Sequence, residues 1–324
     1  MTLLLAGGHQ DPNLTVLADA AQRMNVEILD LRLPANESPA FCWSPGDGAP
    51  RFHYQSAEHQ SAEHQSAETG ISGETHSGKS GSSETMAGQI SATGAFIRHD
   101  VFGGMQDPRP EVSTRAAGWY QTMMGWLLSE PRIRLLNRNI SSIAMNKPAS
   151  LVLAREAGLS IPQTWVTNEV SKFSGEQLEQ MIAKPVLGGD YCYSMAEALA
   201  KTDLRSGLAA TPAIVQRKLI APEIRIYVIG RSDFAFEVRS SSLDYRVNQD
   251  AELIFLPEVP QEAVLLRRLM ARLGMDFGAA DFKTDLETGQ LIFLELNTSP
   301  MFARFDQISG GKVCAAMVQE LTMA

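Results

Sequence analysis

The chain has 324 residues, 44% of them hydrophobic, which is enough to form the cores of two or three globular domains. Lys and Arg number 28 against 37 Asp and Glu, so the formal net charge is -9, and no basic run could follow a phosphate backbone. This charge balance argues against nucleic acid as a partner. The N-terminal LLLA is too short for a signal sequence, and no apolar run approaches the roughly 18 residues of a membrane helix. We therefore expect no membrane partner.

The three cysteines, Cys42, Cys192 and Cys314, are far apart in the sequence and form no CxxC pair. An odd number of isolated cysteines indicates neither a disulfide framework nor a structural zinc site. A reducing compartment suits such a chain, so we predict a cytoplasmic location.

The N-terminal residues predict an α/β unit. A strand is expected at 3–6, a helix at 14–24 and a second strand at 26–29. Gly7 and Gly8 follow the first strand, but they do not satisfy the GxGxxG pattern of dinucleotide-binding folds. These glycines therefore indicate a turn and not a dinucleotide site.

From about residue 46 to residue 93 the composition changes. Ser, Gly, Glu, Gln and His dominate, and the pentad QSAEH repeats within 55–68. Such a segment buries too little apolar surface to offset the loss of chain entropy, so we predict a disordered insertion. His59 and His64 recur in the repeat and raise the alternative of metal capture. A slipped repeat in a solvated loop explains them more simply.

Beyond the insertion, the residue pattern predicts ordered elements up to the C-terminus. A strand at 94–103 is followed by a helix at 113–128, whose Trp119, Met123 and Trp126 lie near helical spacing and indicate core packing. Further strands are predicted at 132–137, 165–168, 182–186, 213–219, 223–230 and 233–240, and helices at 150–157, 175–181 and 261–273. Mixed, largely antiparallel strands with flanking helices make this part of the chain α+β.

A hairpin predicted over residues 277–297 carries the most informative polar side chains. Its two strands are joined by DLETGQ, with a turn signal at 288–289. If the hairpin is symmetric about its turn, Asp281 lies opposite Glu295, with the two Cβ atoms about 5 Å apart. Strand alternation places Asn297 on the same face as Glu295.

The second strand of this hairpin also has a hydrophobic side. Ile292, Leu294 and Leu296 are expected to face the core together. On the polar side, two carboxylates would repel each other unless a cation or a proton neutralised them. A hard divalent ion such as Mg²⁺ takes oxygen ligands of this kind and keeps waters or substrate phosphates in its remaining positions. The alternative is an exposed strand end that holds no ion.

With this hairpin, residues 130–324 resemble the ATP-grasp ligases, whose metal-binding motif is an Asp on one strand followed by Glu-x-Asn on the next. The resemblance implies metal ligation by Asp281, Glu295 and Asn297, with ATP and Mg²⁺ as cofactors. Two Mg²⁺ ions are implied, with Mn²⁺ as a substitute.

The fold class implied is α+β, an ATP-grasp fold in which two α/β subdomains clasp ATP. An N-terminal α/β pre-ATP-grasp domain, which contains the disordered insertion, is expected to precede it. The corresponding limits are 1–137 for this substrate-recognition domain, 138–212 for the central ATP-grasp subdomain and 213–324 for the C-terminal subdomain with the metal site.

Two lysines match nucleotide contacts of the ATP-grasp family. Lys147 begins a helix within the segment 141–168, where the family's Lys contacts a nucleotide phosphate. On its own it would resemble an ordinary solvated lysine at a helix start. Lys184 lies in an apolar strand before Gly188 and Gly189, whose main-chain N–H groups can approach phosphate oxygens without steric cost. A simple β-turn is the alternative for these glycines.

The strand 213–219 resembles the hinge that binds adenine, where an apolar strand presents main-chain groups to the edge of the base. The resemblance implies nucleotide contacts for Gln216, Lys218 and Leu219. Many strands end in a similar way, so this assignment depends on the neighbouring motifs.

Two arginines are the candidate catalytic residues. Arg225 fits the family's acid-x-Arg pattern and alternates with Ile224 and Ile226, so it points away from the apolar face; a surface salt bridge is the alternative. The segment 240–246, SSSLDYR, resembles the ATP-grasp maturases that crosslink ribosomal peptides, the microviridin or graspetide ligases. Its Arg246 suits bidentate binding of an acyl phosphate.

The resemblance implies ATP-dependent carboxylate ligation through an acyl phosphate, which forms an amide or ester without a side-chain nucleophile. The first hypothesis is a macrocyclising maturase that joins Asp or Glu side chains of a ribosomal precursor peptide to Lys, Ser or Thr. The second is a ligase that adds an amino acid such as glutamate to a small molecule or a protein terminus, as RimK-type ligases do. The third is a catalytically inactive nucleotide-binding regulatory module. The expected partners are ATP and a precursor peptide or amino acid, and a homodimer is compatible with the resemblance.

Overall fold

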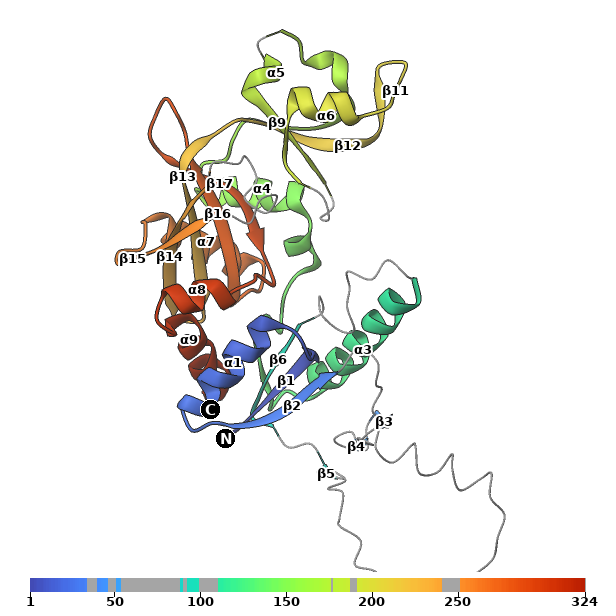
Figure 1. Ribbon diagram of the computed structural model, residues 1–324, viewed down its shortest axis with the longest axis vertical. Coiled ribbons are helices and arrows are strands. Elements are labelled where there is room, and N and C mark those ends of the chain that lie inside the picture. The colour runs from blue at the N-terminus through green and yellow to red at the C-terminus, as the bar shows by residue number, and fades with distance from the viewer. Residues whose placement is uncertain are drawn as a thin grey trace, which may run out of the picture. The chain divides into compact units, whose positions relative to one another are not determined.

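The computed structural model divides the chain into two compact units, Met1–Leu135 with Leu321–Ala324, and Leu136–Glu320. Figure 1 shows the order of the elements along the chain by colour. The domain limits inferred above, near 137 and 212, remain predictions. The structure describes residues 1–33, 40–45, 51–53, 88–89, 92–98, 110–175, 177–186, 191–240 and 251–323. Within these ranges, no helix is both long and apolar enough to cross a membrane.

The first unit is built on a four-stranded sheet in the order β2-β1-β6-β7, with parallel neighbours throughout. Its strand β1 contains Leu3, Leu4 and Leu5, all fully buried, as expected for a parallel strand covered on both faces. The predicted α/β unit is confirmed. The elements are β1 (Thr2–Gly8), α1 (Pro12–Arg23), β2 (Glu27–Leu33), β6 (Gly94–Ile97), α3 (Pro110–Ser129) and β7 (Arg134–Leu135).

Helix α3 confirms the helix predicted at 113–128 and the core packing of its large side chains. Met123, Trp126 and Leu127 are almost completely buried, in one cluster with Leu4 of β1. The helix therefore packs its large apolar side chains against this sheet.

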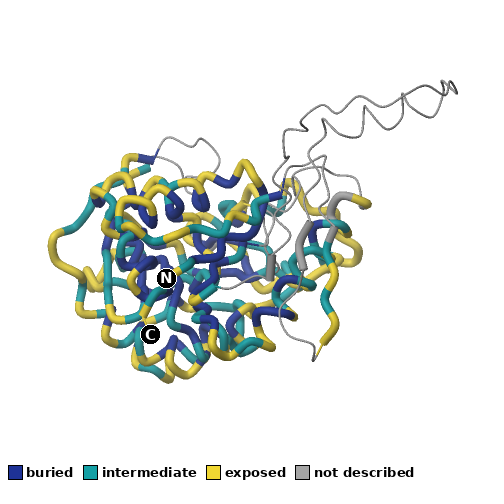
Figure 2. The backbone as a smooth tube through the Cα atoms, turned by 90° about the horizontal axis from the view of Figure 1, so that it is seen from below, coloured by how far each residue is buried: buried dark blue, intermediate teal, exposed yellow. Residues whose placement is uncertain are grey.

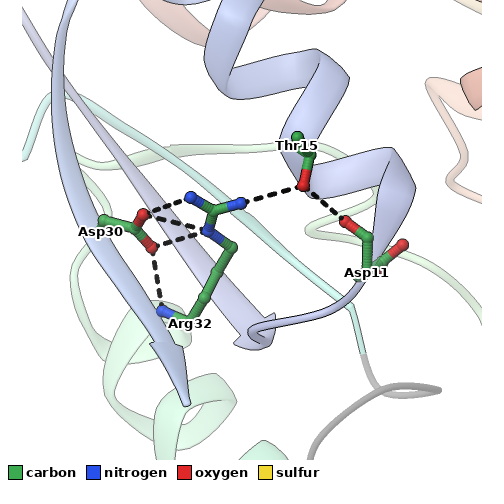
Figure 3. A network of polar contacts seen from close by, with 4 residues as sticks. All are labelled: Asp11, Thr15, Asp30 and Arg32. Atoms are coloured by element: carbon green, nitrogen blue, oxygen red, sulfur yellow. Dashed lines mark hydrogen bonds and ion pairs between the residues drawn. The ribbon is translucent and has the colours of Figure 1, made fainter. Parts of the chain in front are cut away.

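Polar contacts tie the start of α1 to the neighbouring strands. The backbone oxygen of Asp11, the N-cap residue, accepts a hydrogen bond from Thr15 Oγ1 at 3.2 Å. Arg32 of β2 donates to Thr15 Oγ1 at 3.1 Å and, through Nε, to Asp30 at 2.9 Å (Figure 3). The Asp11 carboxylate also accepts from Arg98 Nε at 2.7 Å, and both of these side chains are fully buried. The contacts thus fix α1 on the sheet.

Part of the predicted insertion is ordered, which corrects the prediction at both of its ends. Arg51–His53 forms β4 and Gly88–Gln89 forms β5, and together with β3 (Ala40–Cys42) they make a three-stranded antiparallel sheet. Composition could not predict these strands, because their partner β3 precedes the insertion. Residues 54–87, which contain the repeat and its histidines, lie outside the described residues.

The second unit contains two sheets, of which the first runs β10-β9-β12-β11, with β8 also pairing with β12. One face of this sheet packs a small hydrophobic cluster formed by Phe173, Met181, Ala183, Met195 and Val215. The elements are β8 (Thr164–Glu169), η2 (Val170–Lys172), α5 (Gln177–Gln180), β9 (Met181–Pro185), β10 (Tyr193–Ser194), α6 (Met195–Lys201), β11 (Leu204–Arg205) and β12 (Leu208–Arg217).

The second sheet of this unit is antiparallel, in the order β15-β14-β13-β16-β17. One face packs against α4 and α7, where Ile226, Phe282 and Phe293 are fully buried in one hydrophobic cluster. Figure 2 shows buried and exposed residues along the backbone. The elements are η1 (Ser142–Met145), α4 (Lys147–Glu156), β13 (Ile220–Ile229), β14 (Ser232–Arg239), β15 (Glu252–Leu256), α7 (Glu262–Arg272), β16 (Phe277–Thr284), β17 (Leu291–Asn297), α8 (Ala303–Ile308) and α9 (Lys312–Thr322).

Candidate active site

The hairpin of β16 and β17 places Asp281 directly opposite Glu295, which confirms the predicted pairing of these two residues. In its turn, Gly289 has a φ of 70°, a left-handed conformation that glycine adopts without strain. Asp285 Oδ1 accepts a hydrogen bond from the Thr288 main-chain N–H at 2.9 Å. The turn sets the pairing of the residues next to it, from Thr284 with Leu291 to Phe282 with Phe293.

The pairing shifts by one residue next to this carboxylate pair. Phe282 pairs with Phe293, so Leu294 has no residue opposite it. Phe293 and Leu296 both lie in the core cluster, whereas Leu294 is only partly buried. The prediction that Ile292, Leu294 and Leu296 face the core together was therefore wrong, because a β-bulge reverses the alternation of side chains.

Arg225 on β13 holds the carboxylate of Asp281. Its Nε donates to Asp281 Oδ1 at 2.7 Å and its Nη2 donates to Oδ2 at 2.8 Å, a two-pronged arrangement between side chains that are each 10% exposed. Ile224 and Ile226 lie in the core cluster, which confirms that Arg225 points away from the apolar face. Arg225 therefore makes a salt bridge, but not the surface salt bridge considered as the alternative. The pair is largely buried, and its partner Asp281 is a predicted metal ligand.

Two lysines from separate elements converge on Glu295. Lys147 begins α4, where Asn146 caps the helix, and its Nζ lies 3.1 Å from Glu295 Oε2. Lys184 on β9 has its Nζ 3.7 Å from the same oxygen, and its side chain is 11% exposed. Burial lowers the pKa of Lys184 below its ordinary value, and the Glu295 carboxylate offsets part of that shift. A lysine in this setting favours an anionic neighbour.

Asn297 completes the polar side of the hairpin. Its Nδ2 donates to Asp281 Oδ2 at 3.1 Å, which orients the amide and makes its oxygen the atom suited to a cation. Asn297 and Glu295 also line a cleft of about 190 Å³, whose other walls include Lys147 and Met145. Sites that enclose a whole small ligand usually exceed about 300 Å³, so this cleft suits a group the size of a side chain.

The charges and donors of this site fit Mg²⁺ bound together with a phosphate-bearing ligand. Three cationic side chains meet two carboxylates, which leaves one excess positive charge for an anion. In the described part of the chain, no group of three or more His, Cys, Asp or Glu could hold a metal alone. Mg²⁺ commonly uses one or two carboxylates and takes its remaining ligands from phosphates and water. The donor set therefore fits an ion that the substrate helps to hold.

Gln216 carries a buried acceptor that fits the amino group of a base. Its side chain is fully buried, and its Nε2 donates to Thr164 Oγ1 at 3.0 Å. Among the described residues, its Oε1 has no hydrogen-bond partner, which is costly for a buried amide oxygen. On the neighbouring strand β9, Lys184 pairs with Ile214, which lies two residues before Gln216 on β12. The side chains of Lys184 and Gln216 therefore lie on the same face of the sheet.

Among the described residues, no hydrogen bond or ion pair joins the remaining predicted site residues to the charged cluster around Glu295. Lys218 and Leu219 directly follow β12, with Lys218 exposed and Leu219 buried. Gly188, Gly189 and Arg246 lie outside the described residues, so their assignments stay predictions.

The sequence did not single out the other lining residues of the cleft. Ala144, Met145, Ser150 and Thr298 line it beside the charged groups. Met145 is 70% exposed and ends the short helix η1, which has no clear sequence pattern of its own. The only signal available was their place next to Lys147 and to the Glu-x-Asn motif.

Glu223 and Lys283 form a second ion pair, next to the pair of Arg225 and Asp281. These residues are cross-strand partners on β13 and β16, and their charged atoms lie 3.1 Å apart. Burial raises the pKa of Glu223 above its ordinary value, although Lys283 opposes the shift. The folded protein therefore holds a proton at this carboxyl at a higher pH than the unfolded chain does.

We expect this carboxyl to make the protein less stable as pH rises. Because the folded pKa of Glu223 lies above the unfolded value, its stabilising contribution is complete below the unfolded pKa and is lost as pH passes through the folded pKa. Glu223→Gln removes the titrating carboxyl and, with it, this pH-dependent contribution to stability. The difference in unfolding free energy between wild type and variant, measured in urea at a series of pH values, should change across that interval. A difference that is constant with pH would contradict the expectation.

Comparison with solved structures finds matches over almost the whole chain. The ATP-grasp ligase PsnB, solved with a phosphomimetic variant of its minimal precursor, Mg and ADP, has a TM-score of 0.69 at 19% identity, covering 98% of this chain and 97% of PsnB. The macrocyclase MdnC from Microcystis aeruginosa, bound with the precursor peptide MdnA, has a TM-score of 0.68 at 16% identity, with 100% of both chains covered. The VanG D-Ala:D-Ser ligase from Enterococcus faecalis has a TM-score of 0.54 at 15% identity, covering 99% of this chain and 98% of VanG. No family model matches the chain, and no curated protein matches its sequence.

Proposed function

We propose that this chain, which has the fold of the ATP-grasp ligases, is an ADP-forming ligase that joins a carboxylate to an amine or a hydroxyl. The observation that carries the proposal is the convergence of Lys147 and Lys184 on Glu295, beside Asp281 held by Arg225. Such a cluster of cations and carboxylates suits a triphosphate that is bound with a divalent ion.

The proposed reaction activates a substrate carboxylate by phosphorylation. A carboxylate oxygen of the substrate attacks the terminal phosphorus of ATP, and ADP leaves with the electrons of the broken P–O bond. An amine or hydroxyl then attacks the acyl carbon of the acyl phosphate, loses its proton and displaces inorganic phosphate. The side chains of the enzyme hold and neutralise charge, and none of them needs to be a nucleophile.

The residues of the site divide this work between them. Lys147 and Lys184 bind phosphate oxygens. Asp281, Glu295 and Asn297 hold Mg²⁺, which when bound neutralises charge on the phosphates. A carboxylate has about four acceptor positions, so Asp281 can keep Arg225 while it binds an ion.

The remaining predicted residues complete the proposed site. Gln216 receives the amino group of the base, and Lys218 and Leu219 continue the hinge beside it. Gly188 and Gly189 donate to phosphate oxygens, and Arg246 supplies a second guanidinium to the acyl phosphate.

We assign the substrate to a ribosomal precursor peptide, whose Asp or Glu side chain is joined to Lys, Ser or Thr. The similarity to PsnB and MdnC, both solved with precursors, supports this choice over an amino-acid ligase such as VanG, whose TM-score is lower.

Mass spectrometry distinguishes the candidate functions. The purified protein, ATP and Mg²⁺ are incubated with a precursor peptide rich in Asp, Glu, Thr and Lys that is encoded beside the gene. A maturase lowers the intact mass of the peptide by one water for each bond formed. A gain equal to an added amino acid would support the amino-acid ligase instead. An unchanged mass, with no acceptor-dependent release of ADP, would contradict both forms of ligase.

Mg²⁺ binding is expected to depend on a nucleotide. In the structure, Lys147 and Lys184 both lie against Glu295 Oε2 and Arg225 pairs with Asp281, so Mg²⁺ alone meets a net positive site. Phosphates draw the two lysines away and add ligands. We expect ADP to raise the Mg²⁺ affinity by about 10-fold or more, and Mg²⁺ to raise the ADP affinity by the same factor. Isothermal titration calorimetry measures both; equal Mg²⁺ affinity with and without ADP would contradict this dependence.

A further inference from the structure

Asn137 makes an unusually complete set of hydrogen bonds at the base of the hairpin. It follows β7 with a φ of 56°, a left-handed conformation that Asn tolerates better than most residues. Its Nδ2 donates to Phe277 O at 2.8 Å and to Thr298 O at 3.1 Å. Its Oδ1 accepts from Asp276 N at 3.0 Å and from Phe277 N at 2.9 Å. Both donors and both acceptor positions of the amide are therefore used.

These bonds join the two strand ends that meet at the candidate metal site. Phe277 is the first residue of β16, and Thr298 directly follows Asn297 at the end of β17. Asn297 pairs with Ala279 on the neighbouring strand. A single side chain thus fixes the main chain immediately beside Asn297 and ties it to the start of the strand that carries Asp281.

The chain beyond Thr298 is held in a similar way. The hydroxyl of Tyr227 on β13 donates to Met301 O at 2.5 Å. Asn137 and Tyr227 therefore bracket the segment that leaves the sheet after Asn297. Without the contact from Asn137, Thr298 O would lose its donor, and the main chain next to Asn297 would gain freedom to move.

We propose that Asn137 is a positioning residue that holds Asn297, and with it Glu295, in the geometry needed to bind Mg²⁺. The inference rests on the proposed function, because it concerns the same metal site. Groups that orient metal ligands typically change metal affinity by about 10-fold to 100-fold when they are removed. Asn137 itself touches neither substrate nor metal.

Two substitutions test this role. Asn137→Gly keeps the left-handed backbone without strain and deletes all four side-chain bonds. Asn137→Asp keeps the shape and the acceptors, but it places a carboxylate oxygen against Phe277 O and Thr298 O. Asn25→Gly is the matched control, because Asn25 has a φ of 57° and belongs to the first unit.

Calorimetry measures, for wild type and the three variants, the affinity for ADP in EDTA and with Mg²⁺, and the affinity for Mg²⁺ with ADP present. Both Asn137 variants are expected to bind ADP normally in EDTA but to lose about 10-fold to 100-fold of the Mg²⁺ affinity measured with ADP present. The control should match wild type in both conditions. A lower Mg²⁺ affinity together with normal ADP binding in EDTA distinguishes a positioning role from a general loss of structure.

The other outcomes are equally decisive. An unchanged Mg²⁺ effect in either Asn137 variant overturns the inference while the proposed function stands. Loss of ADP binding in EDTA along with the Mg²⁺ effect, or failure of both variants to fold, shows that Asn137 supports the fold in general, and this also overturns it. A wild type without any Mg²⁺ effect on ADP binding refutes the proposed function and, with it, the inference.

Discussion

Replacing Glu295 with Gln is expected to slow acceptor-dependent release of ADP by about 10³-fold while leaving the protein folded. The substitution keeps the size of a side chain that is 26% exposed, but it removes the charge that meets Lys147 and Lys184 and is proposed to hold Mg²⁺. A bound ion is worth several kcal/mol of transition-state stabilisation, so kcat should fall by about 10³-fold. ADP release and peptide mass, followed in the same reaction, measure the loss.

ADP binding in EDTA separates this effect from damage to the nucleotide site. Because the lysines lose their internal anion, Glu295→Gln should bind ADP in EDTA at least as tightly as wild type. Glu287→Gln is the matched control, since Glu287 lies in the turn of the same hairpin and its side chain is 67% exposed. Turnover by Glu295→Gln close to that of Glu287→Gln would rule out a metal-binding role for Glu295.

Replacing Arg225 with Ala is expected to destabilise the second unit strongly as well as inactivate the site. The substitution leaves the Asp281 carboxylate, whose side chain is 10% exposed, with the weaker hydrogen bond from Asn297 as its remaining one among the described residues. Removing one partner of a buried ion pair typically costs about 3 to 5 kcal/mol, because the other charge stays buried without compensation. Urea unfolding measures this free energy.

Arg239 provides the matched control for this loss. It also pairs through its guanidinium with a carboxylate, that of Glu237, but the Arg239 side chain is 55% exposed. Arg239→Ala should therefore cost far less unfolding free energy than Arg225→Ala, because solvent screens an exposed ion pair. Adding Asp281→Asn to Arg225→Ala should recover part of the stability, since the unpaired charge is gone. Equal losses in the two single arginine variants would mean that burial does not strengthen the Arg225–Asp281 pair.

Local patterns were sufficient to predict much of the candidate site. The turn signal at Gly289 and the alternation of the flanking strands predicted that Asp281 would face Glu295. Alternation with Ile224 and Ile226 likewise predicted the direction of Arg225. These features depend on residues within one hairpin or one strand, where backbone geometry alone relates sequence spacing to side-chain direction.

The sequence by itself determined the types of most elements and predicted that Asp281 and Glu295 would pair. Tertiary structure decided the bulge at Leu294, the strands at the two ends of the insertion and the meeting of Lys147 with Lys184 at Glu295. It also revealed that Asn137 joins two strand ends that lie far from it in the chain. The physical reason is that local spacing fixes directions within an element, whereas packing between distant segments decides which side chains share their charges and hydrogen bonds.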